Sequence, residues 1–372
     1  MDALFDYRYS SILQALGATN VYPHSFQLAR ARSYVENSAR ERFLSTSQHW
    51  KVYRTASPFT RRVTCVKWHP RYPDVVAFGA HSGDILLWNF DRPNVSDPVI
   101  KGVGMGYGCI TEMKFHPDDA RLMYTSAVDG RFCLQDFEGR QSQVYLDTMD
   151  IGYWWCSFDL SNEHNIIVIG DNHGSAVLLD SNGQSIGKYK CLHKEKIKHL
   201  EFCPVRPWMV ATASVDRTVA LWDIRMLKEG TLKGSSFIKS PKPITVMKHG
   251  GPVASCYFHG SRLLTTAHNE EIRVYDSHNM WEEPTIIVDH PHRHFQHMTD
   301  IRATWHPLYS DLCVIGRYPR KEDEDKTRSV DLIDLVSGQC VGYFYSPHLS
   351  NIIQVGPKVL ITIIYMYSCQ LV

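Results

Sequence analysis

The sequence lacks the features of a secreted, membrane-spanning or uniformly basic protein. It has no apolar run of 18 residues, and its longest apolar tract, 359–367, is too short to cross a bilayer. No basic segment precedes an apolar core at the N-terminus, so we expect no secretory signal. Forty Lys and Arg balance 39 Asp and Glu, for a net charge of +1. This balance excludes a surface that is positive throughout, but it is compatible with a local basic patch.

Cysteine pairs at metal or redox spacing are missing as well. The chain has ten cysteines, but none stands in a CxxC pair, so no zinc knuckle or thioredoxin-type motif is present. Most of the cysteines fall inside apolar runs. We therefore expect buried free thiols in a soluble protein of a reducing, intracellular compartment.

Sequence motifs of catalysis are also absent. There is no GxSxG, HExxH or P-loop motif, and no GxGxxG motif follows a strand. The glycine-rich stretch 102–106 is not followed by the Lys and Ser or Thr of a phosphate-binding loop, and we interpret it as a connection between repeats. We predict that the protein is not an enzyme and uses no cofactor.

What the sequence does contain is an internal repeat. Each copy has an apolar strand that runs into a turn, a second strand, a short turn with Gly or Asp, and a third strand that ends in Asp or Asn. The third strands end at Asn89, Asp136, Asp180, Asp223, Asp276 and Asp334. The first three intervals, of 47, 44 and 43 residues, approach the ~40–45 residues of a four-stranded propeller blade, and the last two are longer and require insertions.

The repeat predicts an all-β fold, a seven-bladed WD-repeat β-propeller whose last blade is incomplete and which follows an N-terminal helical arm. We predict an arm over residues 1–57, a propeller over 58–349 and an atypical tail over 350–372. Strands of a blade are apolar on both faces because each face packs on a neighbouring blade. Residues 25–49 contain no Gly or Pro and read as one or two helices, either a solvated extension or a hook for the groove of a partner.

An insertion rich in histidine, HPHRHFQHM at 290–298, separates the fifth and sixth repeats. His290, His292 and His294 alternate, so they could share one face of a strand and reach one cation. Apart from Asp289, no carboxylate or cysteine stands near them. We predict no metal site and keep a metal-dependent function only as a distant alternative.

The same insertion is also suited to entering a DNA duplex. As a protruding hairpin it would carry Phe295, Gln296 and His297 at its tip, with Arg293 beside them. An aromatic ring can replace base stacking, amide and imidazole groups can hydrogen-bond bases, and a guanidinium can hold phosphate.

Cationic and aromatic residues precede several innermost strands, where propeller loops open on one face of the ring. They include Arg61, Tyr107, Trp154 and Lys196, and the 290–298 insertion has the same position. This pattern predicts a local patch that binds nucleic acid. A propeller that binds peptides remains an alternative on this evidence.

The segments SPFTRRVTCVKWHP, SGDILLWNF, ATASVDRTVALWDIR and HPHRHFQH resemble the small, WD-repeat subunit of the UV-damaged-DNA-binding complex, over most of residues 25–345. The resemblance implies a nuclear protein of nucleotide-excision repair that recognises damaged double-stranded DNA. It implies that the tip residues enter the duplex at a photolesion and that four cations contact the lesion or phosphates. These cations are Arg61, Lys196, Arg293 and Arg328.

The resemblance also implies protein partners. The arm and the surface near Trp222, Asp223 and Arg225 would dock onto a large triple-propeller adaptor subunit, which joins a cullin–RING ubiquitin ligase and brings it to chromatin and histones. For Arg225 the alternative is an ion pair within its own blade. The tail departs from the family, because it has no Gly-Asp turn and no final aromatic pair, as in a truncated or alternatively spliced form. Two alternatives follow: a peptide- or histone-binding scaffold, and a chain that competes for the adaptor without binding DNA.

Overall fold

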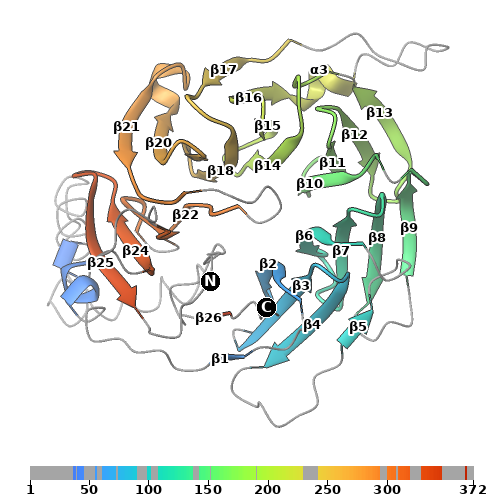
Figure 1. Ribbon diagram of the computed structural model, residues 1–372. Helices are drawn as coiled ribbons and strands as arrows, with labels where there is room; N and C mark the ends of the chain where they lie inside the picture. The colour runs from blue at the N-terminus through green and yellow to red at the C-terminus, as the bar shows by residue number, and fades with distance from the viewer. Residues whose placement is uncertain are drawn as a thin grey trace, which may run out of the picture. The chain divides into compact units, whose positions relative to one another are not determined.

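The apolar strands of the repeat form six four-stranded antiparallel sheets, called blades 1 to 6 here (Figure 1). Within each blade the strands pair in chain order, with the first strand innermost and the fourth outermost. The innermost strands of successive blades contact one another, which arranges the blades around a central axis. The predicted all-β propeller is confirmed for these six blades.

The strands of the blades have the following bounds. Blade 1 consists of β2 (Val63–Trp68), β3 (Val75–Ala80), β4 (Asp84–Asn89) and β5 (Val99–Lys101), and blade 2 of β6 (Ile110–Phe115), β7 (Leu122–Ala127), β8 (Arg131–Asp136) and β9 (Ser142–Asp147). Blade 3 consists of β10 (Trp155–Ser161), β11 (Ile166–Asp171), β12 (Ala176–Asp180) and β13 (Ser185–Tyr189), and blade 4 of β14 (Ile197–Cys203), β15 (Arg206–Ser214), β16 (Thr218–Asp223) and β17 (Thr245–Lys248). Blade 5 consists of β18 (Val253–His259), β19 (Arg262–Ala267), β20 (Glu271–Asp276) and β21 (Pro284–Asp289), and blade 6 of β22 (Thr304–Trp305), β23 (Leu312–Gly316), β24 (Ser329–Asp334) and β25 (Gln339–Tyr345).

The computed structural model describes part of the chain, and the chain divides into two units, residues 1–50 and 51–372. In the first unit residues 40–45 are helical, within the predicted arm, and most of that arm lies outside the described residues. No helix among the described residues is long and apolar enough to cross a bilayer. The described residues are 37–38, 40–45, 55–56, 61–72, 74–89, 99–101, 108–136, 142–150, 152–189, 191–228, 242–293, 300–306, 309–318, 328–345 and 365–366.

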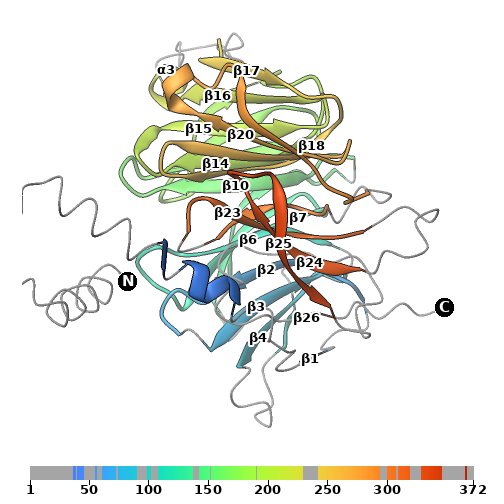
Figure 2. The same cartoon turned by 90° about the vertical axis from the view of Figure 1, so that its left-hand side faces the viewer.

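The second unit contains a few short elements besides the blades. The strands β1 (Thr55–Ala56) and β26 (Tyr365–Met366) pair in parallel, although 309 residues lie between the paired residues Thr55 and Tyr365. Helix α3 (Ile224–Lys228) directly follows β16 (Figures 1 and 2) and packs against β13 and β15. A 3₁₀ turn, η1 (Ser277–Asn279), follows blade 5's third strand. Among the described residues no further four-stranded sheet is present.

The predicted first, second and third strands agree with the structure within a few residues, except in blade 6. There the sixth copy of the repeat begins with IRATWHP, residues 301–307, which predicts an innermost strand of that length, but β22 covers only Thr304–Trp305. The backbone N–H of Ala303 donates to the Thr266 hydroxyl of blade 5 at 2.9 Å instead of pairing with β23. A contact to the neighbouring blade thus replaces the first part of this strand.

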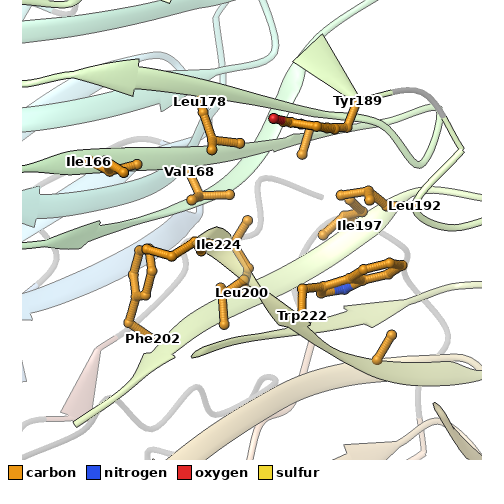
Figure 3. Close-up of a cluster of buried hydrophobic side chains, with 13 residues drawn as sticks. Ile166, Val168, Leu178, Tyr189, Leu192, Ile197, Leu200, Phe202, Trp222 and Ile224 are labelled. Atoms are coloured by element: carbon orange, nitrogen blue, oxygen red, sulfur yellow. The ribbon is translucent and has the colours of Figure 1, made fainter. Parts of the chain in front are cut away.

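Apolar side chains fill the spaces between the blades, as the repeat predicted. Between blades 3 and 4, Val168 and Leu178 face Ile197 and Leu200 (Figure 3). All four side chains are buried, and burial of each contributes about 1.5–3 kcal/mol. Of the nine described cysteines seven are buried and none forms a disulfide, so the prediction of buried thiols holds except at Cys191 and Cys340.

A bulge recurs near the start of the innermost strand in blades 1 to 5. A bulge changes the direction of a side chain. In blade 1 the Thr64 hydroxyl donates to the carbonyl of Ile110 in blade 2 at 2.6 Å, and Thr111 donates likewise to Trp155 in blade 3 at 2.8 Å. The bulged residues are Thr64, Thr111, Cys156, Lys198 and Ala254.

Charged side chains from the innermost strands also connect the blades near the axis. Lys67 Nζ lies 2.8 Å from Glu112 Oε1, and Lys114 Nζ lies 2.7 Å from Asp159 Oδ1. The backbone N–H of Phe258 donates to Glu201 Oε2 at 2.6 Å. Each of these contacts joins one blade to the next.

Three further contacts join blades that are not neighbours. Arg302 of blade 6 approaches Glu112 of blade 2, with Nη1 3.7 Å from Oε2, and its Nη2 donates to the carbonyl of Lys198 in blade 4 at 3.3 Å. Lys198 Nζ forms an ion pair with Asp300, which precedes β22. Blade 6 is therefore linked across the axis to blades 2 and 4.

Candidate nucleic-acid interface

Backbone hydrogen bonds place the loops that lead into the innermost strands at one end of the blades. The carbonyls of Arg62, Trp154 and Lys196 accept from the first residue after the second strand of the same blade, at 2.9, 3.2 and 3.0 Å. Because the strands are antiparallel, the turns between the first and second strands lie at the other end. We call the end with residues 61–62, 152–154, 191–196 and 290–293 the Lys196 face.

Lys196 stands beside an aromatic ring on this face. Its Nζ lies 5.6 Å from the centroid of the Trp154 ring, within range of a cation–π interaction. Both side chains are half-buried. Trp154 Nε1 is buried and has no hydrogen-bond partner among the described residues. The pair therefore offers a cation and an aromatic surface side by side.

Two cations from the loop before β2 lie around the same place. Burial raises the pKa of the Cys109 thiol to about 11, and the charges of Arg62 and Lys196 oppose this rise, so both cations lie near Cys109. Burial lowers the pKa of His81, and Arg62 and Arg61 lower it further. Arg61 is exposed. Loops of blades 1 and 4 thus bring positive charge to the surface above blade 2.

The predicted residues Arg293 and Arg328 meet in blade 6. The backbone N–H of Arg293 donates to the carbonyl of Tyr318 at 3.1 Å, and its side chain is exposed. The Arg328 guanidinium lies 4.7 Å from the centroid of the Tyr318 ring and donates to its hydroxyl at 3.4 Å. Tyr318, which the sequence did not single out, therefore joins the two arginines.

The histidines of the insertion are engaged in hydrogen bonds. His290 and His292 are buried and share a contact between their Nδ1 atoms at 3.2 Å. His290 Nε2 lies 3.2 Å from Asp331 Oδ2, and His292 Nε2 lies 3.0 Å from the Ala267 carbonyl. These contacts occupy all four ring nitrogens and fix the start of the insertion. No group of three metal-ligating side chains is present among the described residues, and His294 lies outside them.

Four of the predicted DNA-binding residues lie outside the described residues. They are Tyr107 and the tip residues Phe295, Gln296 and His297. The described ends of that insertion, Arg293 and Asp300, are anchored in blade 6 and on Lys198 of blade 4, respectively.

The three residues predicted to bind an adaptor lie at the other end of the blades. Arg225 donates to both carboxylate oxygens of Asp223, at 2.9 and 2.6 Å, and its guanidinium lies 4.3 Å from the centroid of the Trp208 ring. The Arg225 side chain is 56% exposed in spite of the ion pair. The Trp222 side chain is buried, so it supports this surface from below and does not form part of it.

Trp222 belongs to a buried hydrogen-bond network that sequence analysis missed. Its Nε1 donates to the Thr212 hydroxyl at 2.8 Å, and His193 Nε2 contacts the same hydroxyl at 2.7 Å. His193 Nδ1 lies 3.0 Å from Asp216 Oδ2. Although burial alone would raise the pKa of Asp216, hydrogen bonds from His193 and Thr218 hold that pKa well below its ordinary value. The network fixes the loop that ends at Lys196.

The fold and this network define a class of protein. Residues 184–223, which contain the network's His193, Asp216 and Trp222, match the family described as "WD domain, G-beta repeat". With six four-stranded blades in the described part of the sequence, the chain is a WD40-repeat β-propeller.

Relatives narrow the class to one family. The chain is 42% identical to DNA damage-binding protein 2 of Gallus gallus over 328 residues, which cover 84% of this chain and 62% of that protein. It is 38% identical to the Bos taurus protein of the same name over 93% of this chain and 78% of the relative, and 39% identical to that of Danio rerio over 92% and 67%. The chain belongs to the DNA damage-binding protein 2 family.

Proposed function

We propose that this chain recognises damaged double-stranded DNA through the Lys196 face. The observation that carries the proposal is the gathering of Arg62, Lys196 and Trp154 on one face of a chain whose net charge is only +1. A local cationic patch with aromatic surface is suited to phosphate and exposed bases. Relatives named DNA damage-binding protein 2 support the same function.

In this proposal Phe295, Gln296 and His297 enter the duplex at a lesion, where weakened stacking lowers the cost of extruding bases. Arg61, Lys196, Arg293 and Arg328 hold phosphates or the extruded lesion, and Tyr107 contributes an aromatic surface. The chain acts by binding, with no catalytic residue, cofactor or resident metal. It works in the nucleus, in nucleotide-excision repair.

Substitution Lys196→Glu is expected to weaken binding to a duplex with a UV photolesion by roughly tenfold or more and to reduce the slope of log affinity against log salt by about one. The loss follows because a phosphate contact becomes a repulsion. The measurement is a titration of damaged and intact duplexes at two salt concentrations. Arg121→Glu, the same charge change at the other end of the blades, serves as control, because the Arg121 side chain is 88% exposed. Equal affinities of the two variants would contradict the proposal.

We also propose that the opposite end of the blades binds the large triple-propeller adaptor, so that the chain serves as substrate receptor of a cullin–RING ubiquitin ligase at chromatin and histones. The exposed guanidinium of Arg225, which Asp223 and Trp208 hold in one orientation, supports this surface. An arginine held in this way is typical of the residues that dominate interfaces.

Arg225→Ala is expected to weaken adaptor binding by roughly tenfold or more, since a well-placed arginine often carries over 1.4 kcal/mol of binding energy. DNA affinity should stay unchanged. Arg121→Ala is a matched control, because Arg121 also pairs with an aspartate two residues earlier, Asp119, at the same end of the blades. Pull-down with purified adaptor measures the effect. If Arg225→Ala kept full adaptor binding, Arg225 would have a structural role in its ion pair with Asp223 and no role in binding the adaptor.

The domain limits and the seventh blade are part of the proposal. We infer an adaptor-binding arm over 1–57, a propeller over 58–349 and an atypical last blade over 350–372, to which the parallel pair β1 and β26 belongs. A chain that binds the adaptor but no DNA would act as a competitor. A chain that binds histone peptides, but does not bind damaged DNA and shows no salt-dependent binding to DNA, would be a scaffold.

A further inference from the structure

Lys198 differs from the residues at its position in the other blades. The bulged residue of the innermost strand is small in blades 1, 2, 3 and 5, and in blades 1 and 2 its hydroxyl donates to the next blade. In blade 4 it is a lysine whose amine passes the neighbouring blade 5 and reaches Asp300, at the end of the loop 290–300 before blade 6. The lysine at this bulge thus contacts a residue that leads into the second blade along, whereas Thr64 and Thr111 contact the next blade.

The contact is a buried ion pair with two-point geometry. Lys198 Nζ lies 2.7 Å from Asp300 Oδ2 and donates to Oδ1 at 2.9 Å. The two side chains are 4% and 3% exposed. His268 Nε2 lies 3.3 Å from Oδ1 and borders the carboxylate from blade 5. Blades 4, 5 and 6 therefore converge on one carboxylate.

Stability alone does not account for such a pair. Transferring an ammonium and a carboxylate from water to the protein interior costs as much free energy as their attraction returns, or more. A well-packed pair of apolar side chains in the same place often gives equal stability. Burial lowers the pKa of Lys198, as do the charges of Lys196 and Arg302, while Asp300 opposes the shift. A charged pair in this place therefore defines geometry, because only one arrangement satisfies both groups.

The pair defines the distance between two parts of the Lys196 face. Lys198 lies two residues after Lys196, a separation of roughly 7 Å along a strand. Asp300 ends the loop that begins with the anchored histidines His290 and His292. The charge of Lys196 lowers the pKa of Lys198 and opposes the rise in the pKa of the Cys156 thiol that burial causes. This cation therefore lies close to the pair.

We propose that the Lys198–Asp300 ion pair is a positioning element that holds Asp300, on the C-terminal side of the insertion 290–298, in register with Lys196, so that the insertion and Lys196 act on one duplex at a lesion. The proposal rests on the proposed function and extends it to residues that do not touch DNA themselves. Lesion preference requires this register because the loop and the phosphate contact must act at once. Attraction to intact DNA requires the charge of Lys196 but not the register.

The test is the double variant Lys198→Met with Asp300→Asn, which removes both charges without leaving one unpaired. The ratio of affinities for damaged and intact duplexes should fall roughly three- to tenfold, while affinity for intact duplex stays within about twofold. The matched control is Lys114→Met with Asp159→Asn, the same substitutions in another ion pair of the axis, 2.7 Å long and distant in sequence from the loop. Its ratio should equal that of the unchanged chain. Lys198→Arg, which can still pair with Asp300, should keep most of the preference.

An unchanged ratio in a folded double variant would overturn the proposal, as would an equal loss in the control pair. If the double variant does not fold, Lys198→Gln with Asp300→Asn, which also removes both charges, replaces it with the same reading. If the unchanged chain itself shows no preference for damaged duplex, the proposed function fails, and the pair is then tested without DNA. Amide hydrogen exchange at residues 300–303 should be faster in the Lys198–Asp300 variant than in the control variant, and equal exchange would refute the positioning role.

Discussion

Replacing Lys67 with methionine is expected to destabilise the protein by about 3–5 kcal/mol, because the substitution leaves the carboxylate of Glu112 buried without its nearest cation. Lys67 Nζ lies 2.8 Å from Glu112, whose side chain is 3% exposed, and the other cation, Arg302, is 3.7 Å away. Although burial alone would raise the pKa of Glu112, Lys67 and Arg302 lower it to about 2. The free energy of unfolding, from urea titration at pH 7, measures the effect.

Two comparisons separate the ion pair from the loss of the lysine chain. Adding Glu112→Gln to Lys67→Met should recover most of the stability, because no unpaired charge then remains. Arg121→Met, at an exposed ion pair, should change stability by less than about 1 kcal/mol. Since the native pKa of Glu112 is lowered, its contribution is present above about pH 4.5 and is lost as the pH falls toward 2. A Lys67→Met variant with full stability would show that Glu112 is solvated.

Glu201→Gln is expected to remove the pH dependence of stability that Glu201 gives the protein. Burial, aided by the charge of Asp159, raises the pKa of Glu201 to about 8, against the opposing effects of Lys114 and the Phe258 N–H. The folded protein therefore holds this proton more tightly than the unfolded chain. The contribution to stability is full below about pH 4.5 and is lost as the pH rises through 8, at up to about 1.4 kcal/mol per pH unit.

Glutamine removes this titration and can still accept the Phe258 N–H through its carbonyl. The variant should therefore be more stable than the unchanged chain at pH 8 to 9, and the gap should close toward pH 5. Melting temperatures across this range, measured for both chains, give the difference without the contributions of other groups. Glu282→Gln at an exposed position is the control and should leave the curve unaltered. Parallel curves for Glu201→Gln and the unchanged chain would show that the carboxyl group ionises as it does in water.

The strands could be predicted from the sequence because propeller blades bury both faces. Val76, Phe78 and Ile169 lie inside apolar runs bounded by turn residues, and each is buried. The fourth strands have no such signal, since residues such as Lys188 and Ile287 are exposed on the outer edge. The shortening of β22 could not be foreseen, because the competing partner of Ala303 is a hydroxyl 37 residues earlier in the chain.

The candidate site was predictable in part for a similar reason. A residue that precedes an innermost strand must lie on one face, so Arg61, Lys196 and Arg293 were placed there by register alone. Tyr318 was missed because it belongs to a different loop, which meets Arg293 through a backbone hydrogen bond.

Long-range charge pairs give no sequence signal. Lys198 and Asp300 are 102 residues apart, and a lysine within an apolar strand does not reveal its partner. The Trp222 network does leave a trace in the sequence, because His193 precedes the innermost strand and Asp216 stands in the turn after the second strand of the same repeat.

The contacts of Arg302 and Lys198 have a consequence for how the blades unfold. In an array where each repeat touches only its neighbours, stability is a sum of local terms, and one end can melt while the other persists. Here residues of blade 6 form ionic contacts with blades 2 and 4. Unfolding of blade 6 therefore removes Arg302 from Glu112 in blade 2 and Asp300 from Lys198 in blade 4. These contacts near the axis therefore make unfolding of the blades cooperative. A destabilising change near either end of the propeller also lowers the stability of blades far from it.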